Sequence, residues 1–220
     1  MRYPETDFRI YLVTSGTDDH TIDTAASVAA AGAGVVQVRA KELPTRDLLG
    51  LVTACATAVQ RANPTTKVVV DDRADVAYAA RLAGAPVHGV HLGQDDLPAE
   101  AARAMLGSDA LIGLTTGTLP LVHKAEEVHR AQPGVLDYIG AGPFRPTPTK
   151  TSGREPLGVD GYRTLVAATS LPIIAIGDIT PDDVEALSAT GIAGCAMVRA
   201  LMHAENPGET TRRALAHFHC

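Results

Sequence analysis

The chain has 220 residues, of which 45% are hydrophobic and 20% are charged, and its formal net charge is −6. This length and composition fit a globular domain with a sizeable core and exclude a disordered or fibrous chain. The mild acidic charge, without long Lys or Arg runs, argues against a nucleic-acid or membrane-surface partner, so we expect small-molecule partners bound in a local pocket.

Short apolar runs rich in Val and Ile alternate with Ala-rich stretches of helical period along the chain. Eight such runs predict strands, at residues 8–14, 34–40, 67–72, 87–93, 110–116, 136–142, 171–178 and 193–199. Between them the pattern predicts helices, among them residues 23–32, 45–62, 73–84, 98–106 and 181–191. This alternation is typical of repeated βα units.

Residues that favour helix ends support several of these helices. Thr180 can cap a helix that has Pro181 at its first position and acidic residues in its first turn. Gly32, Gly84 and Gly191 follow predicted helix ends, where glycine is favoured. The predicted boundaries are therefore supported by local chemistry as well as by periodicity.

Eight βα units in a chain of 220 residues leave little room for linkers. They predict an α/β protein with a single (β/α)8 TIM barrel domain over residues 1–220, and a doubly wound open sheet is the alternative. In a barrel the active site lies where the strands end. Polar or glycine residues gather at these ends: Gln37, Arg39, Lys41, Asp71, Asp72, Gln94, Asp95, Asp96, Thr115, Thr116, Gly177, Asp178 and Arg199.

Three polar residues close the second predicted strand. Gln37, Arg39 and Lys41 alternate with Val38 and Ala40, so all three point to one side. Three polar groups on the inner side of a barrel are costly unless an anion satisfies them, and a diphosphate would do so. The alternative is that the Arg and Lys side chains simply point into solvent.

A pair of carboxylates closes the next two strands. Asp72 and Asp96 end neighbouring strands, which lie about 4.8 Å apart, so their loops can meet over one ion. Two carboxylates with phosphate oxygens and water commonly hold Mg²⁺, although Asp96 could instead cap the helix that follows it. His88 and His91 fall on opposite faces of one strand, which favours a structural role for each. No Cys or His spacing suggests zinc.

The usual signatures of covalent or nucleotide chemistry are missing from the sequence. It contains no G-x-S-x-G, no P-loop, and no G-x-G-x-x-G after the first strand. The polar end of the barrel is therefore suited to hold anions and a cation, and it offers no obvious strong base.

The cysteines and the hydropathy pattern indicate in which cellular compartment the protein is expected. Cys55, Cys195 and Cys220 show neither paired nor metal-ligand spacing, which favours a reducing environment. No stretch reaches the roughly 18 apolar residues of a membrane span, and the N-terminus lacks the apolar run of a signal peptide. We expect a cytoplasmic protein with no membrane partner. The sequence leaves its oligomeric state open, a homo-oligomer included.

Several segments together resemble the thiamine phosphate synthase family, also called thiamine-phosphate pyrophosphorylase. They are QVRAK (37–41), DDRADVA (71–77), GVHLGQDDLP (89–98), IGLTT (112–116), DYIGAGPFRPTPTK (137–150), PLG (156–158) and AIGDIT (175–180). The resemblance covers nearly the whole chain. It implies a transferase that joins hydroxymethylpyrimidine diphosphate to hydroxyethylthiazole phosphate with Mg²⁺, giving thiamine phosphate and diphosphate.

The resemblance also implies roles for individual residues. The implied ligands of the substrate diphosphate are Gln37, Arg39, Lys41, Thr115 and Lys150, and those of Mg²⁺ are Asp72 and Asp96. The implied ligands of the thiazole phosphate are Thr147 and Thr149, with backbone groups near Gly177, Asp178, Val198 and Arg199. Arg39, Lys41 and Lys150 are the expected catalytic residues, because they would neutralise charge on the departing diphosphate. The attacking thiazole nitrogen carries no proton, so no general base is required.

Three positions depart from the family pattern. Asp71, which we group with the substrate-binding residues, stands where the family usually has Asn, and a carboxylate there either repels a diphosphate or recruits metal. Asp178 replaces a usual glycine, and Gly117 replaces a common histidine. We predict that Arg199 pairs with Asp178, the alternative being that Asp178 turns outward.

Two other functions are compatible with parts of the pattern. The carboxylates Asp71 and Asp178 motivate a catalytically silent protein that binds phosphate or a thiamine precursor, but the retained cationic and acidic residues speak against it. A thiazole tautomerase resembles the synthase but relies on the histidine that Gly117 replaces, and it lacks the P-T-x-T-K loop. The synthase is therefore the favoured prediction.

Overall fold

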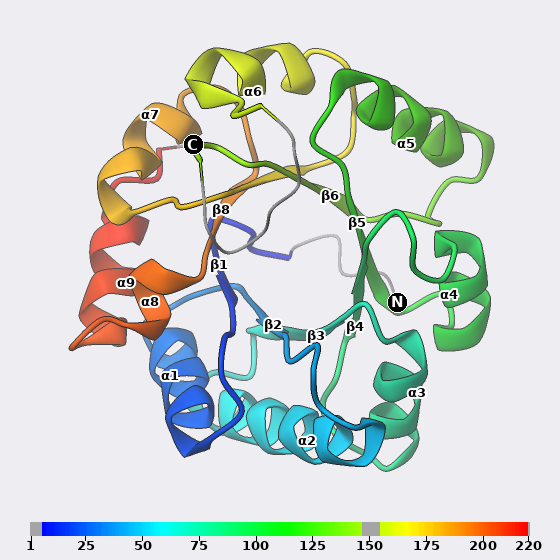
Figure 1. The fold of residues 1–220 in the computed structure, drawn as a ribbon, viewed down its shortest axis with the longest axis vertical. Helices are drawn as coiled ribbons and strands as arrows, with labels where there is room; N and C mark the ends of the chain where they lie inside the picture. The colour runs from blue at the N-terminus through cyan, green and yellow to red at the C-terminus, as the bar shows by residue number, and fades with distance from the viewer. Residues whose placement is uncertain (1–5, 147–154, 220) are drawn as a thin grey trace.

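Eight parallel strands close into a barrel in the computed structural model, which describes residues 6–146 and 155–219 (Figure 1). The strands pair in chain order and β8 pairs with β1, which closes the sheet. They are β1 (Ile10–Val13), β2 (Val35–Val38), β3 (Lys67–Asp71), β4 (Gly89–Leu92), β5 (Leu111–Thr115), β6 (Tyr138–Ala141), β7 (Ile173–Ile176) and β8 (Gly194–Met197). Every predicted strand range contains one of them, so the TIM barrel is confirmed and the open-sheet alternative is wrong.

Helices surround the barrel on all sides (Figure 1). They are α1 (Asp19–Ala30), α2 (Thr45–Ala62), α3 (Ala74–Leu82), α4 (Ala99–Leu106), α5 (Leu119–Ala131), α6 (Gly158–Val166), η1 (Pro181–Asp183), α7 (Val184–Ser188), α8 (Arg199–Met202) and α9 (Pro207–Ala216). The first helix begins earlier than predicted, because the Asp18 carboxylate accepts a hydrogen bond from the Thr21 amide at 3.2 Å and caps it.

The ends of the predicted helices behave largely as their residues suggest. Gly32, Gly84 and Gly191 have φ of 103°, 83° and 89°, a region that favours glycine. Thr180 precedes the 3₁₀ turn η1, and its amide donates to the Asp183 carboxylate at 2.8 Å. The sequence therefore located this helix start, but its first turn is 3₁₀ rather than α.

Alternation along the strands separates two apolar clusters. Outward residues such as Leu12 and Val36 pack in the layer between strands and helices. Inward residues such as Tyr11, Val69 and Tyr138 form a smaller cluster inside the barrel. The polar residues that follow the same inward alternation at the strand ends consequently enter the mouth of the barrel.

His88 and two cysteines lie outside the barrel mouth. The His88 ring accepts a hydrogen bond from the Val68 amide at 3.0 Å, and burial lowers its pKa to about 4, which confirms the predicted structural role. Cys55 and Cys195 are buried free thiols, and burial raises the pKa of each to about 12, whereas Cys220 lies outside the described residues. None of the helices in the described part of the chain is long and apolar enough to cross a membrane.

Candidate active site

A cavity of about 590 Å³ opens at the carboxyl ends of the strands. Every predicted site residue that the structure describes lines it: Gln37, Arg39, Lys41, Asp71, Asp72, Asp96, Thr115, Gly177, Asp178, Val198 and Arg199. Thr147, Thr149 and Lys150 lie outside the described residues. Side chains from distant parts of the sequence therefore meet at the end of the barrel where this fold places its active sites.

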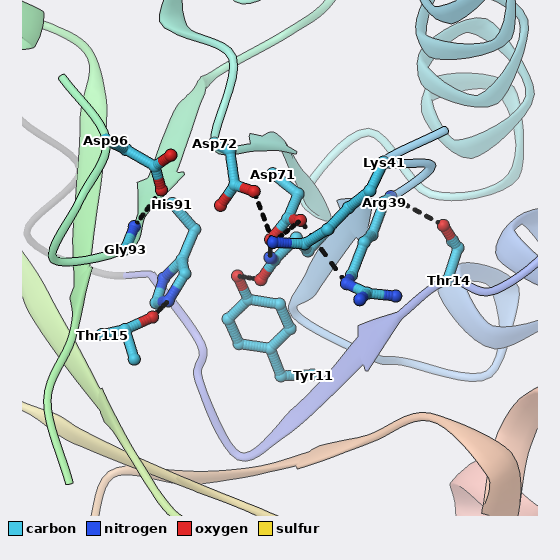
Figure 2. A network of polar contacts seen from close by, with 11 residues as sticks. Tyr11, Thr14, Arg39, Lys41, Asp71, Asp72, His91, Gly93, Asp96 and Thr115 are labelled. Atoms are coloured by element: carbon cyan, nitrogen blue, oxygen red, sulfur yellow. Dashed lines mark hydrogen bonds and ion pairs between the residues drawn. The ribbon is translucent and has the colours of Figure 1, made fainter. Parts of the chain in front are cut away.

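Two cations enter the cavity from the segment after β2. The Arg39 amide donates to the Thr14 hydroxyl at 2.9 Å, which fixes the course of this segment. Lys41 reaches across the cavity, where its Nζ lies 2.6 Å from Asp72 Oδ2, and Arg39 Nε lies 3.5 Å from Asp71 Oδ2 (Figure 2). Burial opposes the charge on Lys41, but the hydrogen bond that it donates to Asp72, together with the charges of Asp71 and Asp72, outweighs burial and raises the pKa of the ammonium. The alternative of solvent-directed cations is wrong.

Asp71 is the most enclosed carboxylate at the cavity mouth. Its side chain is 10% exposed, and it accepts a hydrogen bond from the Gln37 amide through Oδ1. Burial disfavours its charged form and the neighbouring Asp72 carboxylate adds to the effect, so its pKa rises to about 6. The residue that departs from the family pattern thus lies at the centre of the polar network.

Asp72 and Asp96 meet from neighbouring strand ends, within hydrogen-bonding reach of each other. Burial disfavours the charge on both, but the hydrogen bond from Lys41 lowers the pKa of Asp72, whereas the pKa of Asp96 is raised. Asp96 Oδ2 also accepts from the Gly93 amide at 2.6 Å, and a Cβ at position 93 would lie 2.7 Å from that oxygen. The absence of a side chain at Gly93 therefore leaves room for the Asp96 carboxylate to contact the Gly93 amide.

The same geometry tests the capping role predicted for Asp96. Helix α4 begins after Pro98 and has no side-chain cap, so the capping alternative is wrong. Two carboxylates that close neighbouring strands at one point are a donor set that a divalent cation satisfies well. No cluster of three or more His, Cys, Asp or Glu able to hold a metal ion occurs within residues 6–146 and 155–219, so this pair would supply two ligands of the ion.

The floor of the cavity is a chain of polar contacts between inward side chains. Tyr11 OH donates to Gln37 Oε1 at 2.7 Å and lies 2.9 Å from Tyr138 OH. The His91 ring lies between Tyr138 and Thr115, with Nδ1 3.1 Å from the phenol of Tyr138. Its Nε2 lies 2.9 Å from the Thr115 hydroxyl (Figure 2). Burial raises the pKa of both phenols above 10, so both keep their protons at neutral pH.

His91, Tyr11 and Tyr138 were not predicted as site residues. The structural role assigned to His91 is incomplete, because this histidine faces the cavity. The pairing of β3 with β4 sets Asp71 opposite His91, so the alternation that turns Asp71 inward also turns His91 inward, and neither strand alone reveals this register. A Cβ at Gly113 would lie 2.2 Å from Tyr138 Cζ, so the glycine makes room for the aromatic ring.

Close backbone approach shapes the opposite side of the cavity. The Phe144 amide donates to the Ile176 carbonyl at 2.9 Å, and the Arg145 amide donates to the Gly177 carbonyl at 3.2 Å. Gly177 has a φ of 118°, and a Cβ there would lie 2.5 Å from the Phe144 nitrogen. Only glycine fits between the loops after β6 and β7.

The predicted ion pair between Asp178 and Arg199 is present. Arg199 Nη2 lies 2.5 Å from Asp178 Oδ1, and Asp178 has a φ of 58°. Arg145 Nη1 donates to the Asp178 carbonyl at 3.1 Å. The outward-facing alternative for Asp178 is therefore wrong, and Val198 and Arg199 of the neighbouring strand end line the same side of the cavity.

Comparison with known proteins gives consistent matches. The family model described as thiamine monophosphate synthase matches residues 10–201. A thiamine-phosphate synthase from Corynebacterium jeikeium is 55% identical, covering 96% of this chain and 95% of that protein. The synthase from Corynebacterium efficiens is 53% identical, covering 98% and 97%. Thiamine phosphate pyrophosphorylase from Pyrococcus furiosus superposes with a TM-score of 0.82 at 27% identity, covering 97% and 96%.

Proposed function

This chain belongs to the thiamine monophosphate synthase family, and we propose that it joins hydroxymethylpyrimidine diphosphate to hydroxyethylthiazole phosphate in the cavity at the barrel mouth. It is an enzyme of the thiamine-phosphate synthase type. The observation that carries the assignment of the site is that all the described residues implied by the family resemblance line this one cavity.

The side of the cavity formed by β2 to β4 receives the diphosphate. Arg39 and Lys41 are its described cations, and the carboxylates Asp71, Asp72 and Asp96 stand beside them. Two cations facing three carboxylates cannot attract a polyanion by themselves, because like charges about 4 Å apart repel by roughly 4 kcal/mol at an effective dielectric of 20. A divalent cation held by Asp72 and Asp96 reverses this balance.

Mg²⁺ fits this donor set, because it prefers carboxylate oxygens and keeps its remaining positions for phosphate and water. When bound, it supplies positive charge that stabilises the leaving diphosphate. Lys41 and Arg39 exchange their present carboxylate partners for phosphate oxygens as substrate binds. Gln37 and Thr115 add polar contacts, and Lys150, which lies outside the described residues, adds a further cation.

The floor of the cavity receives the pyrimidine ring. A ring attached to a diphosphate at Arg39 and Lys41 extends into the barrel, where Tyr11, Tyr138 and His91 offer aromatic surface and polar atoms. Such a pocket excludes water from the reacting methylene carbon, which strengthens the electrostatic contacts around it.

The side formed by β6 to β8 receives the thiazole phosphate. Gly177, Asp178, Val198 and Arg199 line it. Thr147 and Thr149, which lie outside the described residues, are the proposed side-chain ligands of the same phosphate. The displacement is dissociative: the carbon–oxygen bond at the methylene carbon breaks early and its electron pair leaves with the diphosphate, and the thiazole nitrogen then donates its electron pair to that carbon. No proton is transferred at either atom, so Arg39, Lys41 and Lys150 act through charge.

The test is incubation of the purified protein with both substrates, with and without Mg²⁺. We expect thiamine phosphate and diphosphate in equal amounts with Mg²⁺, and strongly reduced product after EDTA treatment. Substrate binding without product would instead support the silent binding protein.

A further inference from the structure

One continuous chain of hydrogen bonds crosses the barrel interior from β3 to β5. It runs from the Asp71 carboxylate through Gln37, Tyr11, Tyr138 and His91 to Thr115. The four contacts that follow Gln37 measure 2.7, 2.9, 3.1 and 2.9 Å in that order. Each group in this hydrogen-bond chain has few hydrogen atoms to donate. Fixing which group donates at one end therefore fixes which group donates at every later contact.

The Asp71 end sets the direction. A carboxylate oxygen accepts hydrogen bonds, so the Gln37 side chain must turn its NH₂ group toward Asp71 and its carbonyl oxygen toward Tyr11. Tyr11 then donates its single hydroxyl hydrogen to Gln37. The contact between the two phenols can consequently be donated only by Tyr138.

The remaining links follow in the same way. Tyr138 has used its one hydrogen on Tyr11, so it accepts from His91, and His91 must carry a hydrogen on Nδ1. In the neutral imidazole, Nε2 then accepts from the Thr115 hydroxyl.

We propose that Asp71 is a positioning residue that sets the direction of this chain and thereby fixes the Nδ1–H tautomer of His91. This role rests on the proposed function in one respect: the hydrogen-bond chain borders the pocket assigned to the pyrimidine. The hydrogen-bond chain determines which atoms of the cavity floor donate and which accept. It thereby selects a pyrimidine ring whose own donors and acceptors are complementary to them.

The carboxylate of Asp71 matters because an amide of the same shape reverses the donor and acceptor roles along the hydrogen-bond chain. Asp71 Oδ2 lies 3.5 Å from Arg39 Nε and 3.9 Å from Lys41 Nζ. In an Asp71→Asn variant the amide oxygen faces these cations and the NH₂ group faces Gln37. Gln37 then turns its NH₂ group toward Tyr11, Tyr11 donates to Tyr138, and Tyr138 donates to His91 Nδ1. The histidine is left with its hydrogen on Nε2.

The experiment is ¹⁵N NMR of the histidine side chains in substrate-free protein above pH 8, with the His91 signals assigned by their loss in His91→Gln. We expect an Nδ1–H imidazole in the starting protein and an Nε2–H imidazole in Asp71→Asn, each favoured by at least about tenfold. An Nε2–H imidazole or an imidazolium in the starting protein would overturn the proposal, as would an unchanged tautomer in Asp71→Asn.

A second pair of variants separates transmission from general disturbance. Tyr138→Phe removes the hydroxyl that links Tyr11 to His91, so adding Asp71→Asn to Tyr138→Phe should leave the His91 tautomer where Tyr138→Phe alone puts it. A further shift in the double variant would show that Asp71 acts by another route. Because these spectra need neither substrate nor turnover, a failure here is distinct from a failure of the proposed function.

Discussion

The two sides of the cavity mouth are built in different ways. The carboxylate side, formed by Arg39, Lys41, Asp71, Asp72 and Asp96, consists of charged side chains that pair with one another. The glycine side, formed by Gly177, Asp178, Arg199 and Arg145, depends on close backbone contacts and a few arginine contacts. The first side must rearrange its pairs to bind a ligand, whereas the second holds its shape through the backbone.

This difference predicts that substitutions on the two sides of the cavity mouth have different effects. A change on the carboxylate side should alter charge and metal dependence with little effect on stability, because most of its groups are partly exposed at the cavity mouth. A change on the glycine side should alter the shape of the loops and therefore stability and substrate affinity together. Four predictions follow from this contrast, from the largest expected effect to the smallest.

Asp72→Asn should have the largest effect. Loss of one carboxylate of the proposed metal pair should lower kcat by roughly 10²-fold or more, since removing a preorganised charge contact costs about 3 kcal/mol. The Mg²⁺ concentration needed for half-maximal rate should rise. Steady-state kinetics across a Mg²⁺ series would measure both.

Asp75→Asn is the matched control for this variant. Asp75 is exposed on α3 and pairs with Arg73 outside the cavity, so its loss should leave kcat nearly unchanged. Full activity of Asp72→Asn at limiting Mg²⁺ would remove Asp72 from the metal site and weaken the contrast between the two sides.

Gly177→Ala should act through the backbone. Its Cβ would meet the Phe144 nitrogen at 2.5 Å in a conformation with φ of 118°, so the free energy of unfolding should fall by about 2 kcal/mol. The KM for thiazole phosphate should rise because the loops after β6 and β7 separate. Denaturant unfolding and steady-state kinetics provide the two measurements.

Gly50→Ala is the corresponding control. Gly50 lies inside α2 with no atom within 4 Å of the new Cβ, so the substitution should stabilise the protein by up to about 1 kcal/mol. Equal stability of Gly177→Ala and the parent protein would contradict the shape-based account of the glycine side.

The parts of the fold that sequence could predict are those set by local patterns. Runs of Val and Ile located all the strands, and the predicted helix 45–62 has the observed bounds of α2, because periodicity and strand length are properties of neighbouring residues. The polar strand ends were predictable for the same reason. Their substrate and metal roles stay predictions.

The parts that sequence missed depend on register and on turns. His91 faces the cavity because β3 pairs Asp71 with it, and this pairing is a property of two strands rather than one. Gly113 makes room for Tyr138 of the paired strand β6, which the sequence around Gly113 does not reveal. Asp96 precedes a helix, as a capping residue would, but its carboxylate turns back to the Gly93 amide.

The Asp178–Arg199 pair tests whether charge matters on the glycine side. Arg199→Ala should raise the KM for thiazole phosphate about tenfold in the Asp178 protein, because the carboxylate then faces the phosphate unpaired. In an Asp178→Gly background the same change should raise KM by less than about threefold. Equal effects in both backgrounds would show that the pair is not coupled to phosphate binding.

The smallest effect concerns Asp183, which ties together the loops on the glycine side. Its carboxylate accepts from the Thr180 amide and hydroxyl at 2.8 Å each, and it pairs with Arg145, which also donates to the Asp178 carbonyl. Burial disfavours the charge on Asp183, but the Thr180 amide and the Arg145 side chain outweigh burial and hold the pKa below 3.8.

The sign of the pH dependence follows from this lowered pKa. The stability that ionised Asp183 contributes is present above pH 3.8, the ordinary value, and is lost as the pH falls through the lower pKa of the folded protein. Asp183→Asn should therefore lower the free energy of unfolding by about 1 kcal/mol at pH 7, and the difference should shrink below pH 3.8. Asp182→Asn, which removes an exposed neighbouring carboxylate, should change stability by less than about 0.5 kcal/mol. A destabilisation of Asp183→Asn that does not shrink as the pH falls below 3.8 would mean that the negative charge of Asp183 is not what stabilises the glycine side.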